Sequence, residues 1–142
     1  RVRWQAKAPK IEGLHAALAV VASAADARGR LVRVKLARGG ADGLLLRFDE
    51  KTPVLAMGLP GKVRVIGKEA DKGPSFIRCS GRSCDGLKVD LLLGTKKPVT
   101  AMLVAQRFVP PREAAPLLAL RPNTAQPQYS PDSQVDIQAV KL

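Results

Sequence analysis

The stretch Leu31–Leu36, with the sequence LVRVKL, decides the fold class of this chain. Its apolar residues occupy every second position, and the cations Arg33 and Lys35 lie between them. A period of two places the apolar side chains on one face of an extended segment and the charged ones on the other. We therefore expect a β-strand here that has one face turned toward a core.

Other short runs along the chain are compatible with the same structure. They are bounded by Gly, Pro, Asp or Lys, the residues that turns require. The strands that we expect from them are Leu44–Phe48, Val63–Ile66, Ser75–Cys79, Leu87–Leu93, Thr100–Phe108 and Val135–Leu142. Many short strands at regular spacing predict an all-β fold, an antiparallel β-sandwich.

Two segments depart from this rhythm. Ala16–Ala27 is rich in alanine, which favours helix, but a strand here would form a hairpin with Arg30–Arg38, so we expect a strand. Near the C-terminus, the prolines of Pro110–Leu120 forbid a continuous strand and predict one short helix or turn. The Pro-rich stretch Arg121–Asp132 is then expected as an extended loop across the surface before the last strand.

Cys79 and Cys84 are the only cysteines of the chain. We expect a disulfide between them, which would stabilise so short a loop by about 2 kcal/mol and would place the domain outside the cytosol. Unpaired thiols and a metal site are the alternatives. A structural zinc needs four ligands, and His15 is the only histidine.

Length and composition limit the possible architectures. The 142 residues predict a single domain over 1–142, and a hydrophobic content of 46% is too high for a disordered chain. No apolar run approaches the roughly 20 residues that a membrane-spanning helix needs. The chain begins at Arg1 without a methionine or signal peptide. Together with the cysteines, this indicates a fragment of a longer exported or membrane-anchored protein.

The charge balance is strongly basic, with 24 Lys and Arg against 12 Asp and Glu and a net charge of +12. Such an excess attracts polyanions, but the cations are spread singly over expected strands and turns. Nucleic acid is an unlikely partner because single-strand binding also requires exposed aromatics. The aromatics are too few, and most are expected at core positions: Trp4, Phe48, Phe76, Phe108 and Tyr129. A merely solvated basic surface is the favoured interpretation, and non-specific attraction to an anionic membrane surface is the alternative that follows it.

Groups that could form a catalytic site are scarce. His15 has no partner that spacing would place beside it, and Asp49–Glu50 is expected to close a loop. Ser80–Ser83 lacks the order of a nucleophile elbow. Gly58–Gly61 is expected as a hairpin turn. The sequence thus assigns no catalytic, cofactor-binding or metal-binding residue to this chain.

Three residues are candidates for contact with a partner. Arg82 lies at the tip of the expected disulfide loop, where a solvated arginine is the favoured alternative. Tyr129 lies in the Pro-rich loop, where its hydroxyl is expected to fix the loop more readily than to contact a ligand. Trp4 is expected as a core anchor and, secondarily, as part of an interface.

Four phrases of the sequence resemble a known family. They are RVRW at 1–4, PVLAMGLPG at 53–61, IRCSGRSCDGL at 77–87 and ALRPNTAQPQYSPD at 119–132. The likeness is to the C-terminal region of bacterial membrane-anchored zinc metallopeptidases, similar to the aminopeptidase-like family twenty-eight of metallopeptidases. It covers nearly the whole chain, and its most specific part runs from Arg107 to the final strand.

The resemblance implies a periplasmic β-sandwich that follows a two-zinc exopeptidase domain and a set of transmembrane helices. The zinc ligands would lie in that catalytic domain, and none of their motifs is present in 1–142. The implied function is that of a non-catalytic accessory domain, which packs against the catalytic domain of the same chain or against another protomer, with its basic face toward anionic lipid. The alternative is a free-standing secreted binding module for an acidic glycan or peptide.

Overall fold

The computed structural model of the chain describes residues 14–66, 74–125 and 131–142. The expected central strand forms β2 (Gly29–Ala37), and its apolar residues Val32, Val34 and Leu36 are all buried. Before it, β1 (Ala17–Asp26) pairs with β2 in an antiparallel hairpin, so the expectation of a strand in the alanine-rich segment is confirmed. The antiparallel pairing of β1 with β2 outweighs the helix propensity of alanine.

The turn between β1 and β2 explains the glycine at its end. Asp26 accepts a hydrogen bond from the backbone N–H of Arg28 at 2.9 Å, and Gly29 has a φ of 152°. A Cβ atom at Gly29 would lie 2.0 Å from the carbonyl oxygen of Leu93. Only glycine allows this close approach of the hairpin to the neighbouring strand.

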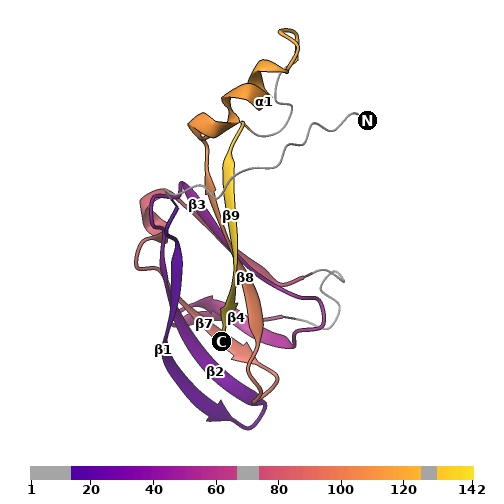
Figure 1. Cartoon of the computed structure of the whole chain (residues 1–142). Helices are drawn as coiled ribbons and strands as arrows, with labels where there is room; N and C mark the ends of the chain where they lie inside the picture. Colours follow the sequence, from indigo (N-terminus) through magenta and orange to yellow (C-terminus); the bar gives the residue numbers. More distant parts are fainter. Residues whose placement is uncertain (1–13, 67–73, 126–130) are drawn as a thin grey trace.

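Two antiparallel sheets make up the fold (Figure 1). Sheet A has the strand order β1-β2-β7-β4-β5, and sheet B has the order β6-β3-β8-β9. The remaining strands are β3 (Gly43–Phe48), β4 (Val54–Leu59), β5 (Lys62–Val65), β6 (Phe76–Ser80), β7 (Lys88–Leu93), β8 (Thr100–Arg107) and β9 (Gln134–Lys141). The prediction of an all-β sandwich is therefore confirmed, and all eight expected strands lie within two residues of their predicted bounds.

The core lies between the inner faces of the two sheets. Its buried side chains are almost all aliphatic, and Phe48 is the one aromatic residue among them. Leu46 and Phe48 from β3 meet Leu91 and Leu93 from β7 in one cluster of buried residues. Leu44, Leu103 and the disulfide-bonded Cys84 belong to a second cluster.

The sequence did not predict β4. Its residues read VLAMGL and lack alternation, because the pairing of β4 with β7 shifts register between Val54 and Ala56. The shift turns Ala56 toward the outer face of sheet A, opposite Leu92. The expected turn at Gly58–Gly61 is correspondingly shorter, because Gly58 and Leu59 belong to the strand.

The positions of two aromatic residues differ from the prediction. Most of the aromatic residues were expected in the core, yet only Phe48 is buried among the described ones, and Phe76 and Phe108 are 55% and 46% exposed. Phe76 lies on the outer face of sheet B opposite Arg47, and Phe108 follows the end of β8. The alternation of a strand does not say which of its faces is turned to the core when both carry apolar residues.

Candidate interaction surface at the end of the sandwich

The connection between β8 and β9 projects beyond the end of the two sheets (Figure 1). The described residues of this projection, 108–125 and 131–133, are called the tip. It holds a 3₁₀ turn, η2 (Arg112–Ala114), and a five-residue helix, α1 (Ala115–Ala119). The short helix or turn that the prolines of this segment predict is confirmed. Pro116 lies in the first turn of α1, where its missing N–H costs no helical hydrogen bond.

The tip buries almost nothing against the sandwich. No residue of η2 or α1 is buried, and the exposed fractions of Phe108, Val109 and Leu120 are 46%, 64% and 63%. Short helices in proteins owe most of their stability to packing of an apolar face. The apolar residues of the tip are therefore uncovered in the part of the chain that the structure describes.

Hydrogen bonds and one ion pair give the tip its shape. The guanidinium of Arg121 donates to both carboxylate oxygens of Asp132, once at 2.8 Å to Oδ2 and once to Oδ1, and so joins the two ends of the loop. These side-chain hydrogen bonds lower the pKa of Asp132 and raise the pKa of Arg121. At the base, the amide of Gln106 donates to the hydroxyl of Ser133 at 3.1 Å.

Asp42 connects the base of the tip to the rest of the sandwich. Its carboxylate accepts a hydrogen bond from the backbone N–H of Phe108 at 2.8 Å, and its backbone N–H donates to the carbonyl of Gln106 at 2.8 Å. Its carbonyl accepts from the N–H of Gly81 at 2.6 Å. One residue of the β2–β3 loop thus fixes both the tip and the segment that carries the disulfide.

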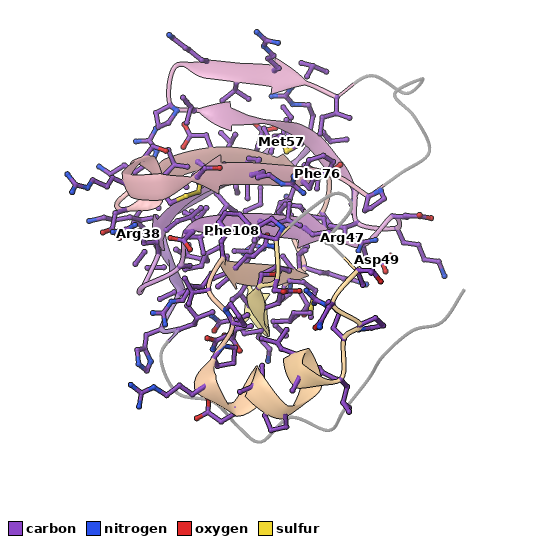
Figure 2. The ribbon with its side chains drawn as sticks, turned by 90° about the horizontal axis from the view of Figure 1, so that it is seen from above. Arg38, Arg47, Asp49, Met57, Phe76 and Phe108 are labelled. Carbon is purple, nitrogen blue, oxygen red and sulfur yellow. A yellow bond between two sulfur atoms is a disulfide. The ribbon has the colours of Figure 1, made fainter. Side chains whose placement is uncertain are left out.

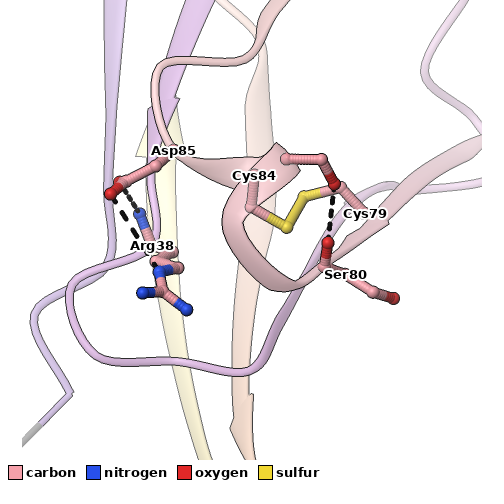
Figure 3. The surroundings of a disulfide bond; sticks show 6 residues. Arg38, Cys79, Ser80, Cys84 and Asp85 are labelled. Atoms are coloured by element: carbon pink, nitrogen blue, oxygen red, sulfur yellow. Dashed lines mark hydrogen bonds and ion pairs between the residues drawn. A yellow bond between two sulfur atoms is a disulfide. The ribbon is translucent and has the colours of Figure 1, made fainter.

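The disulfide segment lies beside this loop (Figure 3). The expected Cys79–Cys84 bond is present, with a Cα–Cα distance of 5.4 Å that is ordinary for a disulfide, and it closes around the 3₁₀ turn η1 (Gly81–Cys84). Ser83 Oγ donates to the carbonyl of Ser80 at 2.6 Å. Asp85 accepts from the backbone N–H of Arg38 at 3.1 Å, which attaches the end of the turn to β2.

Of the three candidate contact residues, the structure describes one. Arg82 is exposed at the disulfide turn, as expected. Trp4 and Tyr129 lie outside the described residues. Residues 126–130 of the expected extended loop also lie outside them. Asp42 was not singled out, because an Asp-Gly pair in a sequence indicates a turn but says nothing of distant partners.

The groups examined for chemistry lie apart from one another. His15 is exposed, and its backbone N–H donates to the carbonyl of Gly39 at 2.8 Å. Asp49 accepts from the N–H of Lys51 at 2.8 Å and so closes a loop, as expected. Within 14–66, 74–125 and 131–142, no group of three or more His, Cys, Asp or Glu side chains is placed to hold a metal ion.

The basic charges do not gather on one face. Arg38 and Arg47 lie on opposite sides of the molecule (Figure 2). Three arginines are bound by carboxylates within hydrogen-bond distance: Arg28 by Asp26, Arg33 by Asp90 and Arg121 by Asp132. This distribution agrees with the scattered cations of the sequence.

Comparisons of the chain with protein-family models, with curated proteins and with solved structures give no match. None of the described helices is long and apolar enough to cross a membrane. The fold and the exposed tip therefore define the class of protein: an all-β domain with a projecting apolar surface.

Proposed function

We propose that the chain is a non-catalytic, extracytoplasmic accessory domain of a membrane-anchored zinc exopeptidase, and that the tip packs against the catalytic domain of the same chain. The single observation that carries the proposal is the uncovered apolar surface of the tip, with Val109 and Leu120 nearly two-thirds exposed. Burying such side chains would contribute about 25 cal/mol per Å² of apolar surface.

The family resemblance of the sequence and the disulfide both support this proposal. The phrase at 119–132 that resembles the metallopeptidases begins in α1 and ends at Asp132, which binds Arg121. The part of the chain with the most specific resemblance is thus the part that projects from the sandwich. The disulfide is compatible with an extracytoplasmic location.

The coding sequence upstream of Arg1 gives the first test. An H-x-D segment, a Glu-Glu pair and several apolar runs of membrane-spanning length are expected in the same frame. A signal peptide alone would contradict the accessory-domain proposal and would favour the alternative, a secreted binding module for an acidic glycan or peptide.

Hydrogen exchange tests the docking surface directly. The backbone amides of Ala114, Leu120 and Arg121 donate only to carbonyls within the tip. They are expected to exchange at least about tenfold more slowly in the full-length protein than in residues 1–142 alone, because a docked segment opens less often. Equal exchange rates in the two proteins would contradict docking through the tip.

Matched variants separate docking from folding. Val109→Asp together with Leu120→Asp should remove the additional protection in the full-length protein. The control is Val21→Asp on β1, which is 47% exposed and lies outside the tip, and it should leave the protection unchanged.

A further inference from the structure

The outer face of sheet A carries a groove whose residues follow from the strand register. One row of cross-strand neighbours crosses all five strands and is entirely apolar. It consists of Ala24, Leu31, Leu92, Ala56 and Val65, in the order β1-β2-β7-β4-β5. Directly paired side chains on one face of a sheet lie about 5 Å apart, so the row forms a continuous apolar strip.

The middle of this strip is hollowed. Leu92 and Ala56 are only 4% and 5% exposed although they lie on the outer face, while Leu31 and Val65 at the sides are 45% and 80% exposed. The groove has a volume of about 550 Å³. This is within the range of about 300 to 1,000 Å³ found for small-molecule sites.

The next row toward the C-terminal end of β2 carries an ion pair, and a small residue lies on each side of it. Arg33 Nε and Nη2 donate to the two carboxylate oxygens of Asp90 at 2.6 and 2.8 Å. Ala22 lies beside Arg33, and Gly58 lies beside Asp90. The two charges neutralise each other at the edge of the groove.

One row further, two lysines stand directly opposite each other. Lys35 of β2 pairs with Lys88 of β7, an arrangement that destabilises a sheet because like charges face each other. Neither ammonium group has a hydrogen bond or an ion pair with any described residue. The carboxylates closest along the chain are Asp90, which binds the guanidinium of Arg33, and Asp85, which accepts from the backbone N–H of Arg38 at 3.1 Å and lies 4.0 Å from Arg38 Nε. Lys35, Lys88 and Arg38 outnumber the one exposed carboxylate of Asp85, so this end of the face carries a net positive charge.

We propose that this face binds a single anionic amphiphile, with its acyl chain in the apolar row and its carboxylate or phosphate group at Lys35 and Lys88. The two rows are four residues apart on β2, or roughly 13 Å in an extended strand, so one elongated molecule can reach both. The negative head group would relieve the repulsion of the lysine pair. A hollow of this size fits one chain rather than a bilayer surface.

The probe for the test is decanoate below its micelle concentration, added to the labelled chain and followed by NMR. Saturable shifts are expected for the amides of Leu31 and Leu92, with an affinity that falls as salt is added. Lys35→Ala together with Lys88→Ala should weaken binding about tenfold. The matched control, Lys51→Ala together with Lys96→Ala in two exposed loops, should not change the affinity.

Further measurements distinguish the contribution of the charged head group from that of the acyl chain. Decanol, which has no charge, should bind about tenfold more weakly than decanoate, and inorganic phosphate alone should not shift the amides of the apolar row. Leu31→Asp should also abolish decanoate binding, and this side chain on the outer face is 45% exposed. Two results would overturn the proposal: unchanged affinity in the double lysine variant, or binding to anionic vesicles without saturable binding of decanoate.

Discussion

The sandwich and the tip are held together by different interactions. Between the sheets, Leu46, Phe48, Leu93 and Leu103 are completely buried, and the strands that carry them pair with neighbours on both sides. In the tip, α1 has no buried residue, and Arg121–Asp132 joins the ends of the loop. The sandwich can therefore be stable by itself, while the apolar surface of the tip is available to a partner.

The largest expected effect comes from the core. Leu46→Ala removes a completely buried side chain and should lower the free energy of unfolding by about 2 to 5 kcal/mol. Leu120→Ala in the tip should change it by less than about 0.5 kcal/mol. Urea unfolding monitored by circular dichroism measures both. Equal losses in the two variants would show that the tip belongs to the same cooperative unit as the core.

The disulfide should have the next largest effect. Cys79→Ala together with Cys84→Ala should lower the free energy of unfolding by about 2 kcal/mol, because the unfolded chain gains entropy when the short loop opens. Addition of a reductant to the native protein should produce a loss of similar size. A reductant without effect on the midpoint of urea unfolding would argue against a stabilising disulfide.

A smaller effect should appear at acid pH. The side-chain hydrogen bonds from Arg33 hold the pKa of Asp90 below its usual range. In the unfolded chain this carboxyl titrates near about 3.9, so its stabilising contribution is present above that pH and is lost as the pH falls through the lower folded pKa.

Asp90→Asn tests this linkage. The variant should have a lower melting temperature than the native protein at about pH 6, and the difference should shrink as the pH approaches about 2. Asp132→Asn is the matched control, because it breaks a similar ion pair in the tip. The control should leave the melting temperature unchanged. A difference for Asp90→Asn that does not depend on pH would contradict a stabilising role for the ionised Asp90 carboxylate.

The smallest effect on global stability is expected for the ion pair of the tip. Arg121→Ala should speed proteolytic cleavage within 108–125 without moving the urea midpoint, because local opening of the tip does not expose the core. Cleavage fragments identified by mass spectrometry give the position. Cleavage in the sheets at the same rate would show that the tip and the sandwich open together.

Most of the sandwich could be predicted from the sequence, because alternation such as that of Leu31–Leu36 is a local signal of a half-buried strand. The disulfide could also be predicted, since only two cysteines are present. β4 was missed because a register shift at Val54 to Ala56 removes the alternation. The expectation that most aromatics lie in the core was wrong for Phe76 and Phe108, because apolar character alone does not tell an inner face from an exposed one.

The sequence by itself determined the all-β class, the turn positions and the short helix or turn among the prolines, because these depend on residues close together in the chain. Only the tertiary structure decided that Asp42 fixes both the tip and the disulfide segment, and that Lys35 faces Lys88 beside an apolar groove. Those placements depend on which strands become neighbours and in which register. Long-range pairing of this kind follows from packing of the whole core and has no signature in a short stretch of sequence.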